Sequence, residues 1–229
     1  MTLKKIGLLG GTFDPVHYGH LQFAESALAE YRLDKVVFLP SAEPPHKNGT
    51  SITSFSHRQA MLSLAGQGMN GFECDPIEAT LPKPSYTIDT LRELRKQYRG
   101  DYRLYFMIGA DAFLDILTWK SYQEVLHSVD IVLSRRKGYK DGRLIVLLKQ
   151  LGYKATNSAW RGKDGKKDIY ILQKTPDDHS SSVIRAMIGR GESVQRYLPE
   201  SVMKYIEKNK LYQSETIAKT SCVRQDYRG

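Results

Sequence analysis

Residues 10–21, GGTFDPVHYGHL, combine residue types and a spacing that suit the binding of phosphate. They follow a short apolar segment and precede a helical pattern, so they lie where a strand ends and a helix begins. Glycines allow the backbone to approach a ligand closely, and a helix start offers unpaired N–H groups with a partial positive charge. His17 and His20 are three residues apart, and each can donate a hydrogen bond to a phosphate oxygen. The segment predicts a phosphate site, against the simpler interpretation of a tight turn with two incidental histidines.

A second segment, residues 180–185 (SSSVIR), has a similar character. Its serines stand at the predicted start of a helix, and Arg185 follows about one turn later. The serines could cap that helix and Arg185 could be a solvated charge, but the set also suits phosphate. The chain has no G-x-G-x-x-G after its first strand and no G-x-x-x-x-G-K-[ST] anywhere, which argues against a dehydrogenase or a P-loop enzyme.

Alternating apolar segments predict the elements that must position these residues. The predicted strands are residues 4–9, 35–39, 72–78, 103–108, 129–134 and 168–173. The predicted helices are residues 21–31, 55–66, 87–98, 142–151, 181–189 and 199–209. This alternation predicts an α/β fold, a Rossmann-like parallel sheet with helices on both faces. Ligands of such sheets bind at the carboxyl ends of the strands, which is where residues 10–21 fall.

The chain of 229 residues is long enough for one or two domains. No linker rich in proline or glycine divides it, so a single domain is predicted over residues 1–213. Residues 214–229 are polar without a sustained period, and a mobile C-terminal tail is predicted there. Within the domain, residues 41–54 and 160–167 are the most loop-like.

The net charge of +9 arises in the second half of the chain. Residues 1–114 carry 12 basic and 12 acidic residues, whereas residues 115–229 carry 22 basic and 13 acidic ones. This excess predicts a polyanionic partner, either a nucleic acid or a phosphate-rich small molecule. The first apolar run is too short for a secretory signal, no run could span a membrane, and Cys74 and Cys222 lack metal or redox spacing. A cytoplasmic protein without membrane contact is therefore expected.

The two phosphate segments resemble the paired signatures of the nucleotidylyltransferase superfamily. In the second signature, His179 and Ser182 stand where the family has isoleucine and threonine. Further matching segments occur in the family's order: residues 44–47 (PPHK), 84–91 (PSYTIDTL), 109–111 (GAD) followed by Trp119, and 197–199 (YLP). Together they resemble bacterial nicotinate-nucleotide adenylyltransferase over about residues 3–212.

The resemblance implies that the adenylyl group of ATP passes directly to nicotinate mononucleotide in NAD biosynthesis. The 5′-phosphate of the mononucleotide attacks the α-phosphorus, and pyrophosphate leaves without a covalent protein intermediate. Such a transfer needs alignment and charge stabilisation more than a protein nucleophile. Mg²⁺ is the implied cofactor, held mainly by the ATP phosphates and water. No protein metal site is expected, because a pair of imidazoles suits zinc better than Mg²⁺.

The resemblance also assigns roles to individual residues. The expected catalytic residues are His17, His20 and Arg185, with His20 nearest the α-phosphate. The expected ATP-binding residues are Gly10, Gly11, Thr12, Phe13, His17, His20, Asp111, Ser181, Ser182 and Arg185, with Asp111 accepting hydrogen bonds from the ribose. The mononucleotide is expected to contact Lys47, Thr87 and Trp119. Its carboxylate would meet the Thr87 hydroxyl and backbone N–H groups near Trp119 and Lys120.

Several of these residues have a purely structural alternative. Asp111 and Thr87 could cap helices, Trp119 could belong to the core, and Lys47 could be a solvated loop charge. Arg58 could be a further phosphate ligand or a charge on a helix surface.

Three alternatives for the whole chain remain open at this point. The acceptor could be nicotinamide mononucleotide or phosphopantetheine instead. The basic second half could belong to a nucleic-acid-binding module, although no nucleic-acid signature accompanies its basic patches at residues 135–137 and 161–167. The chain could also assemble into a homo-oligomer, which the sequence does not decide.

Overall fold

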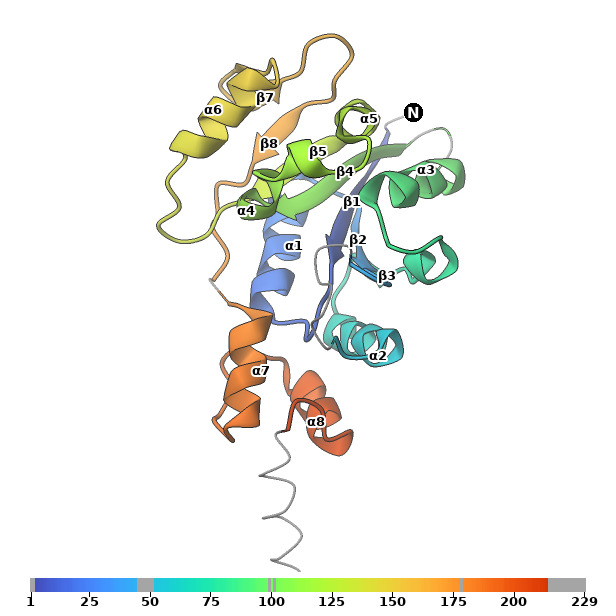
Figure 1. Ribbon diagram of the computed structural model, residues 1–229, viewed down its shortest axis with the longest axis vertical. Helices are drawn as coiled ribbons and strands as arrows, with labels where there is room; N and C mark the ends of the chain where they lie inside the picture. Colours follow the sequence, from blue (N-terminus) through green and yellow to red (C-terminus); the bar gives the residue numbers. More distant parts are fainter. Residues whose placement is uncertain (1–2, 45–51, 99, 101, 178, 214–229) are drawn as a thin grey trace, which may run out of the picture.

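The computed structural model describes residues 3–44, 52–98, 100, 102–177 and 179–213. Its centre is a twisted sheet in the strand order β3-β2-β1-β4-β5-β8-β7-β6 (Figure 1). The strands are β1 (Lys4–Gly11), β2 (Lys35–Pro40), β3 (Phe72–Cys74), β4 (Tyr102–Gly109), β5 (Asp130–Ser134), β6 (Lys154–Ala155), β7 (Trp160–Arg161) and β8 (Ile169–Ile171). The chain order reverses between β1 and β4, and a reversal of this kind opens a crevice for ligands at the carboxyl ends of the strands.

Most of the sheet is parallel, as predicted. Across the sheet, the neighbouring strands β3, β2, β1, β4, β5 and β8 pair in parallel. Strand β7 runs antiparallel to both β8 and β6. The short antiparallel pair includes residues 160–161, which were expected in a loop. The strand predicted over residues 72–78 is also wrong in length, because it ends at Cys74 and a short 3₁₀ helix, η1 (Ile77–Thr80), follows.

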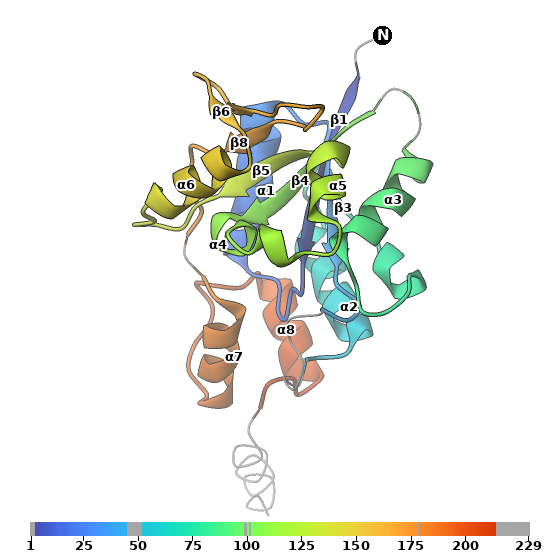
Figure 2. The same ribbon diagram turned by 45° about the horizontal axis from the view of Figure 1, so that its top comes forward.

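Helices cover both faces of the sheet, which confirms the predicted fold class (Figure 2). One face packs against α3 (Thr87–Gln97), α5 (Tyr122–Ser128) and α6 (Gly142–Gln150). The other packs against α1 (Tyr18–Tyr31), α2 (Phe55–Gly66), α7 (Ser181–Gly189) and α8 (Glu200–Lys208). Along β1, Leu8 faces the first layer and Leu9 the second, so the buried strands are apolar on both sides rather than alternating.

Helices α7 and α8 lie on the side of the molecule toward which β1 points (Figure 1). The start of α7 reaches the turn after β1 through a hydrogen bond from Ser181 Oγ to the carbonyl oxygen of Pro15 (3.0 Å). The segment before α8 reaches the same turn, where the Tyr18 N–H donates to the carbonyl oxygen of Tyr197 (2.9 Å). Elements far apart in the chain thus converge on the end of β1.

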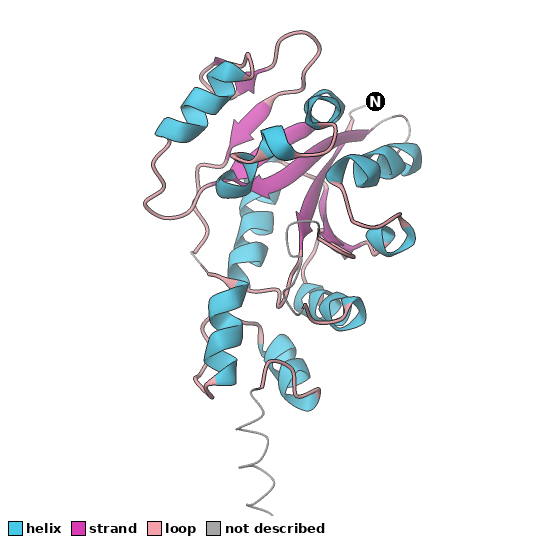
Figure 3. Cartoon of the chain, viewed as in Figure 1, coloured by secondary structure: helices cyan, strands magenta, loops and turns pink. Residues whose placement is uncertain are grey.

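The shortest helices were not predicted from the sequence. They are η1, α4 (Ala110–Phe113), η2 (Ile116–Thr118) and α5, and they sit among the loops in Figure 3. Among the described residues, no helix is both long and apolar enough to cross a membrane. The tail predicted over residues 214–229 lies outside the described residues, and the single domain over residues 1–213 stays a prediction.

Candidate active site

The two signature histidines cap the first helix reciprocally. His17 is the N-cap of α1, and its Nδ1 accepts the N–H of His20 at 3.3 Å. His20 returns the contact, because its Nδ1 accepts the N–H of His17 at the same distance. The two rings are stacked with centroids 3.7 Å apart. In the neutral form of each ring, the hydrogen therefore resides on Nε2.

Burial sets the protonation state of His17. Its side chain is almost completely shielded from solvent, and burial together with the nearby His179 lowers its pKa to about 3. His17 is thus a neutral imidazole at physiological pH and acts as a hydrogen-bond donor rather than a cation. Gly19 is required beside it, because a Cβ there would lie 2.9 Å from the carbonyl oxygen of Asp177 and 3.2 Å from the His17 ring.

A cavity of about 580 Å³ collects most of the residues expected to bind ATP. Both signature histidines line it, together with residues from β1, α4, α7 and the end of β5. The expected residues in its lining are Gly10, His17, His20, Asp111, Ser181, Ser182 and Arg185. Residues separated by more than 160 positions in the chain therefore form one site, as the two-signature interpretation requires.

The start of α7 contributes hydroxyl groups, N–H groups and a cation. The expected N-capping by serine is wrong: Ser180 is the N-cap but makes no capping side-chain hydrogen bond, and its hydroxyl instead contacts that of Ser182 at 2.8 Å. The first N–H groups of the helix therefore have no serine cap and suit an anion. Arg185 donates from Nη1 to the carbonyl oxygen of Asp14 at 2.7 Å, which fixes the guanidinium beside the cavity.

Asp111 lies in the first turn of α4 and does not cap it, since Gly109 is the N-cap. Its carboxylate faces the cavity and pairs with Arg136, at 3.0 Å from Nε to Oδ2. Arg135 also lines the cavity and pairs with Asp141 at 3.0 Å. Part of the basic patch at residues 135–137 therefore belongs to this cavity.

A second cavity, of about 310 Å³, contains the residues expected to bind the mononucleotide. Thr87 and Trp119 both line it. Thr87 is the first residue of α3 and not its cap, which is Tyr86. Trp119 is half-buried with its ring edge-on to Phe106, at a centroid distance of 6.3 Å. The N–H of Trp119 donates to the carbonyl oxygen of Ile116 (3.0 Å), and main-chain donors to a ligand carboxylate near Trp119 and Lys120 stay a prediction.

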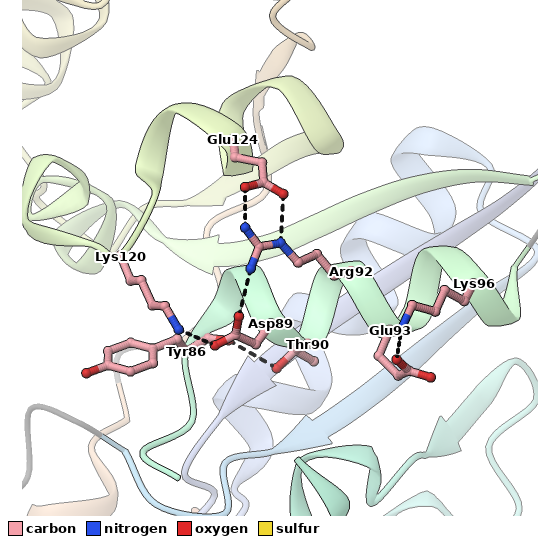
Figure 4. Close-up of polar contacts among 8 residues, drawn as sticks. All are labelled: Tyr86, Asp89, Thr90, Arg92, Glu93, Lys96, Lys120 and Glu124. Carbon is pink, nitrogen blue, oxygen red and sulfur yellow. Dashed lines mark hydrogen bonds and ion pairs between the residues drawn. The ribbon is translucent and has the colours of Figure 1, made fainter. Parts of the chain in front are cut away.

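An ion-pair chain ties the walls of the second cavity together (Figure 4). Lys120 pairs with Asp89 on α3 at 2.7 Å, and its ammonium lies 4.7 Å from the centroid of the Tyr86 ring. Asp89 also accepts from Arg92, which pairs in turn with Glu124 on α5 at 2.5 Å. Because these contacts join α3 to the segment after η2, they hold the Thr87 side of the cavity against the Trp119 side.

The two cavities adjoin at the carboxyl ends of β1 and β4. Gly10, Ile108 and Ala112 line both of them. Gly11 and Thr12 line only the second, and the Phe13 side chain is buried beneath the turn with its ring edge-on to His20, at a centroid distance of 5.0 Å. Of the four residues 10–13, all expected to bind ATP, only Gly10 therefore lines the cavity that also contains the histidines.

Two predicted residues, Lys47 and Arg58, remain to be placed. Lys47 lies outside the described residues. Arg58 is 1% exposed, so the interpretation as a helix-surface charge is wrong, and it lines neither of these cavities. A larger cavity, of about 720 Å³, lies at the opposite ends of β4 and β5, and none of the predicted site residues lines it.

Sequence reasoning assigned no role to three buried groups that hold the site together. The Asp14 carboxylate accepts from the Tyr212 hydroxyl at 2.6 Å and from the Thr53 N–H at 3.3 Å. Glu78 lines the second cavity and accepts from the Thr90 hydroxyl at 3.0 Å. Asp14 belongs to the signature segment and could have been found there. Glu78 and Tyr212 carry no local sequence signal.

Comparisons with known proteins agree with this geometry. The profile of the family described as cytidylyltransferase-like matches residues 8–187. A protein named probable nicotinate-nucleotide adenylyltransferase from Desulfotalea psychrophila is 42% identical over 212 residues, covering 92% of this chain and 100% of that protein. One of the same name from Thermoanaerobacter sp. is 39% identical over 211 residues, covering 92% of this chain and 95% of that protein.

A solved structure matches the fold. The Plasmodium falciparum nicotinic acid mononucleotide adenylyltransferase complexed with NaAD superposes with a TM-score of 0.69 at 19% identity, covering 91% of this chain and 97% of that one. The sequence relatives and the family profile identify the family, whereas the structural match shows the fold alone. The chain belongs to the cytidylyltransferase-like family and, within it, to the nicotinate-nucleotide adenylyltransferases.

Proposed function

We propose that this enzyme transfers the adenylyl group of ATP to nicotinate mononucleotide, giving nicotinate adenine dinucleotide and pyrophosphate. The observation that carries the proposal is the pair of adjoining cavities at the end of β1, one lined by histidines, serines and arginines and the other by Thr87 and Trp119. A direct transfer needs both substrates bound at once with their reacting phosphates next to each other. Cavities that share Gly10 meet that need.

The reaction exchanges one phosphate–oxygen bond for another. An oxygen of the mononucleotide 5′-phosphate forms a bond to the α-phosphorus of ATP, and the bond from that phosphorus to the bridging oxygen of the β-phosphate breaks. Pyrophosphate leaves with the electron pair of that bond. The attacking phosphate is already an anion at neutral pH, so the enzyme needs no general base. Its task is to align the groups and to stabilise negative charge.

The histidine pair stabilises charge at the α-phosphate. Each Nδ1 accepts a backbone N–H, so each ring presents a donor at Nε2. His17 and His20 can then donate to phosphate oxygens as charge builds up in the transition state. His17 does this as a neutral ring because burial lowers its pKa to about 3. A neutral donor is not titrated across the physiological range, so its contribution is constant there.

The β- and γ-phosphates are assigned to the start of α7. This helix begins with Ser181 and Ser182, and its first N–H groups face the same cavity as Arg185. A helix start, two hydroxyl groups and a guanidinium together provide donors for a departing pyrophosphate. Asp111 faces this cavity from α4 and is placed to accept hydrogen bonds from the ribose of ATP.

The mononucleotide is assigned to the second cavity. The half-buried Trp119 offers an aromatic face to the pyridine ring, and Thr87 offers a hydroxyl to its carboxylate. Within the described part of the chain, the Lys120 N–H donates to no backbone carbonyl. We therefore assign it, rather than the Trp119 N–H, as the main-chain donor to the carboxylate. Its cationic side chain lies in the same wall, where it pairs with Asp89 and packs over the Tyr86 ring.

Mg²⁺ is assigned to the substrate rather than to the protein. Among the described residues, no group of three or more His, Cys, Asp or Glu side chains is arranged to hold a metal ion. An ion of this kind would arrive with the ATP phosphates and keep most of its water ligands. Bound there, Mg²⁺ supplies neutralising charge on the triphosphate.

Isotope transfer tests the proposed reaction. ATP labelled at the α-phosphorus, incubated with Mg²⁺ and nicotinate mononucleotide, is expected to label the dinucleotide, while ATP labelled at the γ-phosphorus is expected to label pyrophosphate. Release of labelled inorganic phosphate from the γ-position, with no label in a dinucleotide, would identify an ATPase and contradict adenylyl transfer.

A further inference from the structure

Arg58 is a buried cation that the mechanism above does not use. It lies on α2, is 1% exposed and donates to three backbone carbonyl oxygens. Its Nε donates to Thr53 at 2.9 Å, its Nη1 to Thr12 at 2.8 Å and its Nη2 to Ala42 at 3.4 Å. One planar guanidinium thus joins three segments that are separate in the chain, and a lysine ammonium could not reproduce this fixed fork.

Two of the bonded segments border the second cavity. Thr12 lines the second cavity and directly follows Gly10 and Gly11. Ala42 follows β2, and its neighbour Ser41 donates its N–H to the carbonyl oxygen of Gly11 at 2.9 Å. Arg58 therefore sets how the signature turn lies against the segment after β2, although it lines neither cavity itself.

Glu78 holds the same residue, Ala42, through its N–H. Its Oε2 accepts the N–H of Ala42 at 3.3 Å, while the carbonyl oxygen of Ala42 accepts from Arg58. Its Oε1 accepts the Thr90 hydroxyl on α3. Burial raises the pKa of Glu78 and lowers that of Arg58, and the attraction between the two opposite charges counteracts both shifts. Through Ala42, Arg58 and Glu78 therefore link the signature turn to the helix that carries Thr87, and the carboxylate that attracts Arg58 most strongly is that of Asp14.

We propose that Arg58 is a positioning residue for adenylyl transfer, acting through the backbone of Thr12 and Ala42, with Glu78 as its partner, to keep the two substrate cavities in the relative placement that the reaction needs. The proposal rests on the proposed function, because transfer is its readout. Aligning two phosphates is the main task of such a site, and a displacement of about 1 Å can cost roughly 10²-fold in rate. Loss of the three guanidinium hydrogen bonds should therefore lower kcat more than it weakens substrate binding.

The test compares Arg58→Lys and Arg58→Gln with the wild type. Each variant is measured for kcat, for KM of ATP and nicotinate mononucleotide, and for thermal midpoint, with rates referred to the fraction of protein that binds ATP. We expect Arg58→Lys to lower kcat by roughly 30- to 100-fold, with each KM within about threefold of the wild type. Arg58→Gln should lower kcat at least as much. If one of these two variants does not fold, the other still tests the proposal.

The matched control is Arg103→Lys. Arg103 is a bonded but more exposed arginine, with Nε 2.6 Å from Oδ2 of Asp130, and it lies at the start of β4, at the far end of the strand from Gly109. We expect this variant to keep kcat within about twofold, whatever its stability, because it changes no backbone at the site. A similar loss of kcat in both lysine variants would assign the effect to general destabilisation and overturn the proposal.

The remaining outcomes are also decisive. An Arg58→Lys variant with wild-type kcat, or with a loss confined to KM, would show that Arg58 supports binding or folding rather than alignment. Failure of the proposed function is a separate result, because it appears as absent transfer in the wild type itself. A wild type that adenylylates another acceptor still allows the ratio of variant to wild type to be measured.

Discussion

At the scale of single residues, backbone hydrogen bonds decide what the histidines can do. His17 and His20 each use Nδ1 to accept the other's N–H, so the donor end of both rings is set by the helix start itself. The H-x-x-H spacing alone would equally have suited a metal. The reciprocal cap occupies both Nδ1 atoms, which places the hydrogen of each neutral ring on Nε2.

His20→Ala is predicted to lower kcat by roughly 10²-fold or more, because it removes a donor that strengthens as charge develops in the transition state. The assay is pyrophosphate release at saturating ATP and mononucleotide. His127→Ala is the control, since His127 is exposed and its ring contacts the carbonyl oxygens of Gln123 and Asp164, away from both cavities. Near-normal turnover in folded His20→Ala would remove this residue from the mechanism.

Trp119→Ala is predicted to raise KM for the mononucleotide by about tenfold or more, since stacking of a ring on an aromatic side chain contributes about 1–3 kcal/mol. KM for ATP should change less, because Trp119 lines only the second cavity. Trp119→Phe keeps an aromatic face and should recover most of the loss. Equal losses for both substrates would indicate that Trp119 serves the core through its contact with Phe106.

The sequence predicted residue roles where local signatures exist, and failed where only tertiary contacts decide. Asp111 lines the first cavity and Thr87 and Trp119 line the second, and their roles toward a substrate stay predictions. Arg58 had two predicted interpretations, and its burial against three carbonyl oxygens was neither of them. A charged residue on a helix gives no sign in the sequence of which distant backbone groups it will meet.

At the scale of elements, the long apolar segments were predictable because burial on both sheet faces gives each strand a continuous apolar run. β1, β2, β4 and β5 follow that rule. The 3₁₀ turns, α4 and α5 were missed, because helices of three to seven residues present too few turns to show a period. The β6–β7 pair was missed for a related reason, since two-residue strands have no pattern.

The side chain of Tyr212, which follows α8, is hydrogen-bonded to the signature turn. The Tyr212 hydroxyl donates to the buried Asp14 carboxylate at 2.6 Å, and burial raises the pKa of Tyr212. Tyr212→Phe is predicted to cost about 1.5–3 kcal/mol of the free energy of unfolding, because the acceptor is charged and buried. Urea unfolding at neutral pH measures this loss.

Tyr205→Phe provides the comparison for that loss. Tyr205 lies on α8 itself and its hydroxyl contacts Nδ1 of His57 at 2.9 Å, without a carboxylate. The Tyr205 variant should lose less, about 1 kcal/mol. If the Tyr212 variant proves as stable as the wild type, the contact with Asp14 does not anchor the end of α8.

At the scale of the whole molecule, the charge asymmetry has a partial structural explanation. The second half of the chain carries the net +9, and Arg135, Arg136 and Arg185 from that half line the cavity assigned to ATP. The first half contributes the signature turn and both histidines. The basic excess therefore falls partly where a triphosphate would bind, which favours the small phosphate-rich ligand over a nucleic acid.

Global stability should depend on pH through His17. Its pKa is about 6.5 when unfolded and about 3 when folded, so the unfolded state takes up a proton first as the pH falls. Its contribution is complete above about pH 6.5 and is lost at about 1.4 kcal/mol per pH unit below it, or about 2 kcal/mol by pH 5. His17→Gln removes this term, so its stability deficit against the wild type should shrink between pH 7 and pH 5. Parallel pH profiles in urea unfolding would contradict the assignment.

The central claim is that one cavity holds ATP while its neighbour holds nicotinate mononucleotide for direct transfer. The measurement that tests it most directly is kcat/KM for pyrophosphate release with Mg²⁺–ATP and each of three acceptors: nicotinate mononucleotide, nicotinamide mononucleotide and phosphopantetheine. The nicotinate form is expected to be preferred over both others by about tenfold or more. Preference for phosphopantetheine, or no discrimination among the three, would contradict the roles assigned to Thr87, Trp119 and Lys120.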